Sequence, residues 1–84
     1  MRVRVRLGAG LSRFAEAPLL ALEVPEATTV AGLLDALAAD QPALAPALPS
    51  ALPVVAGAHA TRERPLREGD EVALLIPVAG GARP

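Results

Sequence analysis

The hydrophobic pattern of the chain changes its period twice, and this limits the folds that it can adopt. Residues 2–7 (RVRVRL) alternate strictly between arginine and an apolar side chain. Residues 19–24 (LLALEV) and 71–76 (EVALLI) also have apolar side chains at every second position. A period of two is typical of half-buried strands. The sequence therefore predicts strands near both ends, with a turn or loop at the glycines of residues 8–14.

Between these strands, one segment follows a helical period instead. Its apolar residues are spaced i, i+3, i+4 and i+7, which places them on one face of a helix. They are Val30, Leu33, Leu34 and Leu37. Thr28 or Thr29 can cap the first turn, because a side-chain oxygen there can accept a hydrogen bond from a free backbone N–H. The helix should end at Gln41, since the residue before Pro42 avoids the α region.

The segment after the helix is harder to interpret. Residues 42–53 contain four prolines and predict an irregular stretch, with one short helical turn near Leu44. Residues 53–56 (PVVA) predict a short third strand that turns at Gly57. Residues 61–67 are polar and predict at most a brief fourth strand.

The order of these elements indicates an α+β fold. A chain of 84 residues is expected to form one small domain. One helix of about three turns can cover one face of a mixed four- or five-stranded sheet, with the first and last strands at its centre. This is the ubiquitin-like β-grasp arrangement. We assign residues 1–79 to this domain and residues 80–84 to a flexible carboxyl-terminal tail.

Composition excludes several classes of function. There is no cysteine, which rules out disulfides, thiolate metal ligands and a cysteine nucleophile, and suits a reducing cytoplasm. All eight basic residues are arginines, so no lysine side chain can accept an isopeptide bond. The net charge is −1 and Phe14 is the single aromatic residue, which argues against nucleic-acid binding. No apolar run is long enough for a membrane span or a signal peptide, so we expect a soluble cytoplasmic protein.

No group of side chains forms a recognisable active site or metal site. The Gly-Ala-Gly of residues 8–10 lacks the remaining residues of a phosphate-binding loop. His59 is the single histidine, and Ser12 and Ser50 lack the sequence context of a hydrolase nucleophile. We therefore expect no bound metal and no catalytic group made of side chains.

The arginines of residues 2–7 form the polar face of the first strand. The simplest interpretation is a solvated sheet face on which Glu23 and Glu71, from flanking strands, pair with the arginines. The alternative is a docking surface for an acidic partner protein.

The most informative stretch is the carboxyl end, IPVAGGARP. Pro77 has no backbone N–H and should end strand pairing. Val78 and Ala79 are small, and Gly80 and Gly81 have no Cβ, so another protein could close around their backbone. A carboxylate on such a stem could enter a narrow active site.

Residues 67–81 (REGDEVALLIPVAGG) resemble the carboxyl end of the MoaD/ThiS family of small sulfur carriers. That family has a Gly-Asp-Glu-Val turn into its last strand and then Pro-Val-x-Gly-Gly. The matching residues are Gly69, Asp70, Glu71, Val72, Pro77, Val78, Gly80 and Gly81. The remainder of residues 1–81 agrees in layout, including the Leu-Leu-Asp-Ala-Leu stripe of the helix.

The resemblance implies a function as a co-substrate rather than an enzyme. In this family an E1-like enzyme uses ATP to adenylate the terminal glycine, and a sulfur donor converts the adenylate to a thiocarboxylate. The sulfur then passes to an acceptor enzyme, which for molybdenum cofactor is the large subunit of molybdopterin synthase. Related carriers serve thiamine, cysteine, tRNA thiolation or siderophore synthesis, and some become conjugated to lysines of other proteins. No cofactor is bound by the carrier, and ATP is used by the activating enzyme.

Carried over to this chain, the resemblance makes Gly81 the reactive residue and residues 77–80 (Pro77, Val78, Ala79, Gly80) the segment that threads into partner enzymes. Leu75, on the sheet face opposite the helix, and Val78 are candidates for an apolar docking patch. For Leu75 the alternative is ordinary packing against a residue of the neighbouring strand.

Ala82-Arg83-Pro84 departs from the family pattern, in which the active form ends at the second glycine. A peptidase, such as the zinc-dependent JAMM type, could remove these residues. The chain could instead be a non-conjugating interaction module that keeps them, or they could have been added by cloning. A ubiquitin-like modifier conjugated through Gly81 is a further alternative, because it uses the same activated end.

Overall fold

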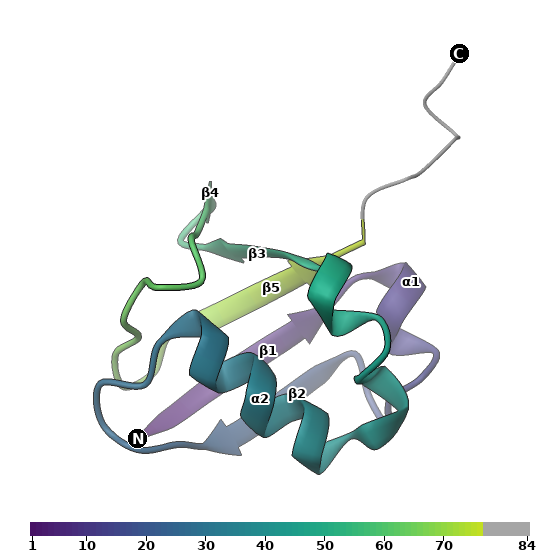
Figure 1. Cartoon of the computed structure of the whole chain (residues 1–84), viewed down its shortest axis with the longest axis horizontal. Coiled ribbons are helices and arrows are strands. Elements are labelled where there is room, and N and C mark those ends of the chain that lie inside the picture. The colour runs from purple at the N-terminus through teal and green to yellow at the C-terminus, as the bar shows by residue number, and fades with distance from the viewer. Residues whose placement is uncertain (77–84) are drawn as a thin grey trace.

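The computed structural model describes residues 1–76, and its main feature is a mixed sheet of five strands (Figure 1). The strands are β1 (Arg2–Leu7), β2 (Leu19–Glu23), β3 (Leu52–Val55), β4 (Ala58–His59) and β5 (Glu71–Leu75). Their order in the sheet is β2-β1-β5-β3-β4. β1 and β5 run parallel, whereas the other neighbouring strands are antiparallel. The prediction that the first and last strands lie inside the sheet is confirmed.

The alternation of β1 places its two kinds of side chain on opposite faces of the sheet. Val3, Val5 and Leu7 are buried, while the three arginines that alternate with them are exposed. On β5, Val72 and Leu74 are fully buried on the same face. Their register, Val5 opposite Val72 and Leu7 opposite Leu74, joins the two strands into the floor of one hydrophobic core.

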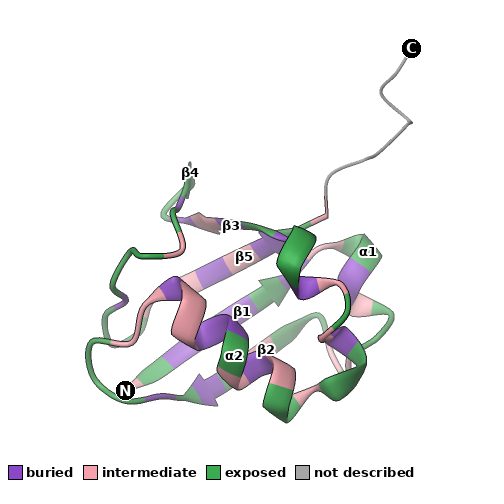
Figure 2. Ribbon diagram, in the orientation of Figure 1, coloured by how far each residue is buried: buried purple, intermediate pink, exposed green. Residues whose placement is uncertain are grey.

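The helix α2 (Val30–Asp40) covers the apolar face of this sheet (Figure 2). Its four predicted core residues are all buried. Thr29 is the N-cap, and its side-chain oxygen accepts a hydrogen bond from the Gly32 N–H at 3.2 Å. Gln41 ends the helix as predicted, because Pro42 follows it.

Residues 8–14, predicted to be a loop, contain the short helix α1 (Ala9–Ser12). The Gly8 carbonyl accepts hydrogen bonds from the N–H groups of Leu11 and Ser12, both at 2.9 Å. The helical turn carries Leu11 into the core, where it is fully buried. Burial of one leucine therefore outweighs the local preference of two glycines for a loop.

The fourth strand predicted within residues 61–67 is wrong. The strand lies earlier, as the two residues of β4, after a tight turn in which Ala56 and Gly57 have φ of 54° and 81°. Residues 61–67 instead bind the start of α2: the N–H groups of Val30 and Ala31 donate to carbonyls of this segment, each at 2.9 Å. The first N–H groups of a helix have no acceptor within the helix, so residues 61–67 provide the acceptors here.

The proline-rich segment contains two 3-10 turns, η1 (Pro42–Leu44) and η2 (Leu48–Ser50). Leu44 and Leu48 are buried beneath them, so the helical turn predicted near Leu44 is confirmed. Within residues 1–76, the helices are too short and insufficiently apolar to cross a membrane. The domain boundary expected after residue 79 lies outside the described residues.

Replacing Leu11 should show how strongly α1 is fixed to the body. We expect Leu11→Ala to lower the free energy of unfolding by about 2–5 kcal/mol, because it leaves a cavity in the core. Phe14→Ala is the comparison: Phe14 is 48% exposed, and its loss should cost about 1 kcal/mol. Urea denaturation of both variants measures the difference. Equal costs would contradict the burial of Leu11.

Candidate functional site

The carboxyl end of β5 is held on both sides by other strands. Leu74 is paired with Leu7 of β1 on one side and with Pro53 of β3 on the other. The β1 ladder continues one residue further, where the Gly8 N–H donates to the Leu74 carbonyl at 2.9 Å. Leu75 still pairs with Leu52. The backbone that leads into the carboxyl-terminal motif therefore starts from a fixed place in the sheet.

α1 contacts this end of β5 closely, and Gly8 makes the contact possible. A Cβ at Gly8 would lie 3.3 Å from both the Leu74 carbonyl oxygen and Leu75 Cδ2. The packing is looser at Gly10, where a Cβ would meet Ile76 at 3.6 Å. The absence of a side chain at Gly8 thus lets α1 brace the last residues of β5.

Four apolar residues form what we call the outer patch, on the sheet face opposite α2. They are Leu52, Val54, Ala73 and Leu75. Leu75 and Leu52 lie opposite each other and are 44% and 40% exposed, so each contacts its neighbour and remains open to solvent. Packing of Leu75 against the neighbouring strand is confirmed, and its docking role stays a prediction. Exposed apolar residues that adjoin one another are typical of protein-binding surfaces.

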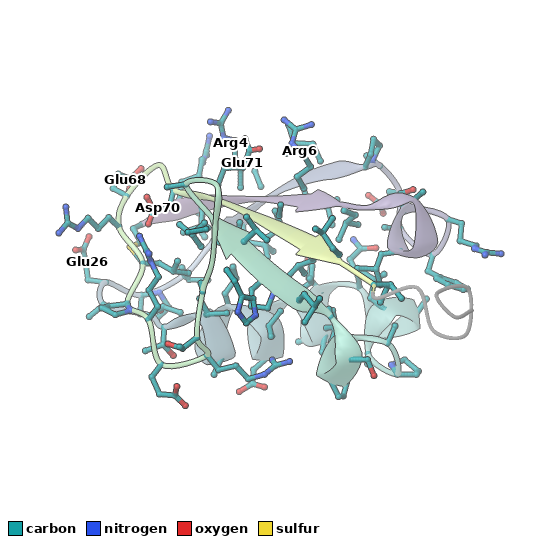
Figure 3. All side chains as sticks on the ribbon, turned by 90° about the horizontal axis from the view of Figure 1, so that it is seen from above. Arg4, Arg6, Glu26, Glu68, Asp70 and Glu71 are labelled. Atoms are coloured by element: carbon teal, nitrogen blue, oxygen red, sulfur yellow. The ribbon has the colours of Figure 1, made fainter. Side chains whose placement is uncertain are left out.

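Charged residues occupy the other part of this face. Arg4, Arg6 and Glu71 project away from the helix side of the sheet (Figure 3). Arg6 Nε donates to Glu71 Oε2 at 2.7 Å, and Arg4 Nη2 lies 3.7 Å from Glu71 Oε1. On the neighbouring strand pair, Arg2 Nε donates to Glu23 Oε2 at 3.0 Å. The predicted pairing of the β1 arginines with Glu23 and Glu71 is confirmed.

These ion pairs change the titration of Glu71. The hydrogen bond from Arg6 holds the pKa of the Glu71 carboxyl below its ordinary value, and the positive charges of Arg6 and Arg4 lower it further. The same hydrogen bond raises the pKa of Arg6. Glu23 and Glu71 therefore compensate part of the positive charge of the three β1 arginines, which remain exposed.

The reactive end expected from the sequence, Pro77 to Gly81, lies outside the described residues. Of the two predicted docking residues, the structure places Leu75 in the outer patch, and Val78 also lies outside the described part. Leu52 was not predicted as a docking residue, because the expected third strand begins at Pro53. The alternation of Leu52 and Val54 against Pro53 and Val55 was the available signal.

Within residues 1–76, no three carboxylate or histidine side chains are grouped closely enough to hold a metal ion. His59 is exposed on the outer face of β4, opposite Val54.

Comparison with known proteins identifies relatives of the whole body. A ThiS family model matches residues 5–81. The structure of SAMP1 from Haloferax volcanii is similar with a TM-score of 0.87 and 28% identity, over 96% of this chain and 100% of that one. A second H. volcanii structure, called small archaeal modifier protein 1, has 27% identity and a TM-score of 0.84, over 92% of this chain and 98% of that one. No curated protein sequence matches the chain.

Two more distant structures have the same fold. A Pyrococcus furiosus protein assigned as molybdopterin converting factor subunit 1 gives a TM-score of 0.78 at 19% identity, over 92% of this chain and 98% of that one. A Helicobacter pylori complex of subunits 1 and 2 of molybdopterin-converting factor gives 0.69 at 22% identity, over 96% of this chain and 100% of the matched one. At these identities the similarity establishes the fold alone. The ubiquitin-like β-grasp prediction is confirmed.

The ion pair between Glu71 and Arg6 should stabilise the fold only while the Glu71 carboxylate is charged. Because its pKa is lowered in the folded protein, the contribution is complete above the ordinary carboxyl pKa of about 4.3 and is lost as pH falls through the lower folded value. Glu71→Gln should therefore lower the melting temperature slightly at pH 7, and the difference from the unmodified chain should shrink as the pH falls towards about 2.

Thermal unfolding followed by circular dichroism at the two pH values measures this effect. Glu16→Gln is the control, because Glu16 makes no ion pair within the part of the chain that the structure describes. A deficit in Glu71→Gln that persists unchanged at about pH 2 would contradict the assignment.

Proposed function

The chain belongs to the ThiS family, and we propose that it carries sulfur as a thiocarboxylate on Gly81. Members of this ThiS/MoaD type are ubiquitin-like sulfur carriers, and the chain is accordingly a carrier that acts with enzymes rather than an enzyme itself. The observation that supports Gly81 most directly is the extent of the family match, which runs to residue 81 and stops at the second glycine.

The proposed chemistry needs a free carboxylate at Gly81. A carboxylate oxygen attacks the α-phosphorus of ATP in an E1-like adenylating enzyme, and pyrophosphate leaves. A sulfur nucleophile then attacks the carbonyl carbon, and AMP leaves with its bonding electrons. Adenylation is required because a free carboxylate is a poor electrophile. We place these steps in the cytoplasm, where the activating enzyme has ATP available, and no cofactor needs to be bound by the carrier.

The geometry of the body suits this use. The carboxyl-terminal motif follows directly from β5, whose end is held by β1, by β3 and by the contact at Gly8. The outer patch lies on the last residues of the same strand. A partner that binds Leu75 and Leu52 would therefore receive the residues that follow Ile76 from a defined starting point. We propose Leu75 and Val78 as docking residues, and residues 77–80 as the segment that enters the partner.

The acceptor that we propose is the large subunit of molybdopterin synthase or an equivalent enzyme. In the H. pylori relative, subunit 1 of molybdopterin-converting factor is in complex with subunit 2. By analogy this chain would deliver sulfur for molybdenum cofactor synthesis.

The second candidate function is a protein modifier joined through Gly81 to lysines of other proteins. The similarity to H. volcanii small archaeal modifier protein 1 supports it. Carrier and modifier share the adenylated intermediate and differ in the nucleophile, which is sulfur in one case and an amine in the other. With no lysine of its own, the chain could not form lysine-linked chains of itself.

Both functions require the removal of Ala82-Arg83-Pro84, so that Gly81 becomes the terminal residue. We propose that a peptidase, such as a zinc-dependent enzyme of the JAMM type, cuts after Gly81. A chain that retains these residues would present the carboxyl group of proline, at the wrong distance from the body.

Two forms of the protein, ending at Gly81 and at Pro84, should differ completely in activation. With an E1-like adenylating enzyme from a MoaD-type pathway, we expect the form ending at Gly81 to support ATP–pyrophosphate exchange. With hydrosulfide added, its intact mass should rise by one exchange of oxygen for sulfur. The form ending at Pro84 should do neither. Equal exchange by both forms, or none by either, would contradict the proposal.

The outer patch should be needed for partner binding. We expect Leu75→Glu to weaken binding to the activating enzyme more than about tenfold, because a buried apolar contact at an interface is replaced by a charge. The matched control is Leu19→Glu: Leu19 has similar exposure, 39%, on the same face but next to Arg6 of β1. Isothermal titration calorimetry measures both. An equal loss in the two variants would rule out a specific patch.

A further inference from the structure

The two edges of the sheet differ in how well they are protected against pairing with another strand. Unpaired edges invite such pairing, and proteins limit it with short strands, prolines and charges at the edge. β4 consists of two residues, Ala58 and His59. β2 is five residues long, Leu19–Glu23, with one charged residue and no proline inside it. β2 is therefore the edge that is available for pairing.

The hydrogen-bond pattern shows which groups of β2 face outward. The N–H groups of Val24 and Leu7 donate to the carbonyls of Met1 and Pro18 across the β1–β2 pair, at 2.8 and 2.7 Å. Hydrogen-bonded pairs alternate with non-bonded pairs along an antiparallel ladder, so the backbone N–H and C=O groups of Leu20 and Leu22 also point toward β1. The N–H and C=O groups of the three remaining residues point away from β1. These residues are Leu19, Ala21 and Glu23, and within residues 1–76 none of their backbone groups is bonded outside the strand ladder.

We propose that this edge pairs with the β2 edge of a second copy of the chain, antiparallel, with Ala21 on the two-fold axis. In that register Ala21 lies opposite Ala21 of the other copy, and Leu19 lies opposite Glu23. All three outward-facing residues can then donate and accept. A shift of two residues in one direction would place Pro25, which has no N–H, at a bonded position. A shift in the other direction would have to extend the ladder beyond β2 to Ala17.

The side chains also match in this register. On the outer face, Glu23 meets Leu19 of the other copy and not a second carboxylate, and it is already bonded to Arg2. Two alanines meet at the axis, where no side chain is large enough to clash. On the core face, Leu20 of one copy lies opposite Leu22 of the other. Leu20 is only half buried in the single chain, so pairing would complete its burial.

The arrangement is compatible with the proposed carrier function. In the order β2-β1-β5-β3-β4, β1 separates the paired edge from β5, and the outer patch lies on β5 and β3. Each copy in the dimer would keep its outer patch and the end of β5 free for a partner. The dimer would therefore present two carriers on one continuous sheet.

The association should be weak and concentration-dependent. Two paired strands of five residues form a small interface, and interfaces below about 1,200 Å² are typical of transient complexes. We expect a dissociation constant on the order of 100 µM. Sedimentation equilibrium of the full chain between about 10 µM and about 1 mM should show a shift from monomer to dimer. A monomer throughout this range would overturn the proposal.

Substitutions at Ala21 test the location. Ala21→Lys places two like charges opposite each other at the axis and should weaken the dimer at least about tenfold. Ala21→Pro removes one outward N–H without affecting the β1 ladder and should also weaken it. Ala39→Lys is the matched control, since it adds the same charge at an exposed position of α2, and it should dimerise like the unmodified chain. Circular dichroism verifies that each variant is folded.

Nuclear magnetic resonance separates this edge from other surfaces. The amide signals that shift with concentration should be those of Leu19, Ala21 and Glu23. A dimer whose shifts map to Leu52 and Leu75, or one that is unaffected by Ala21→Lys, would overturn the assignment to β2.

Discussion

The parallel pairing of β1 with β5 is the constraint on which the rest of the structure depends. It places residues near the amino end directly beside the strand that leads into the carboxyl-terminal motif. Parallel neighbours cannot be joined by a tight turn and require a long connection, usually through a helix. Here the connection supplies β2, α2 and the 3-10 turns, and the helix buries the apolar face of the central pair. The register also carries Gly8 and α1 against the end of β5. The same β1–β5 pairing therefore forms the core and fixes the end of β5, where the candidate site begins.

Sequence was a good guide where a periodic pattern had its cause within the same segment. β1, α2 and β5 were predicted because alternation or helical spacing directly reports which face is buried. The pairing of Arg6 with Glu71 followed from the same faces, as did the exposure of Leu75. Prediction failed where the cause was distant. α1 forms because Leu11 finds a place in the core, and residues 61–67 are fixed by the free N–H groups of α2; neither is visible in local sequence. Leu52 was missed because Pro53, the second residue of β3, was expected to be the first residue of the strand.

The proposed function divides the work between a rigid body and a reactive end. Carrier proteins of this kind must be recognised by an activating enzyme and by an acceptor, and both must reach the same carboxylate. The outer patch and the end of β5 lie together, so recognition and delivery can be coupled through one strand. The arginines of β1 pair with Glu23 and Glu71, and the outer patch is an apolar part of the same face. The free β2 edge lies on the far side of β1, where a second copy does not compete with a partner.

The proposed function requires that Gly81 becomes the terminal residue and carries sulfur. It is tested most directly by the intact mass of the protein purified, without added tags, from the cells that produce it. We expect a species that has lost Ala82-Arg83-Pro84, together with a fraction in which one oxygen of the new carboxyl group is replaced by sulfur. A protein that is found only with Pro84 at its end, during active growth as well as at rest, would contradict it.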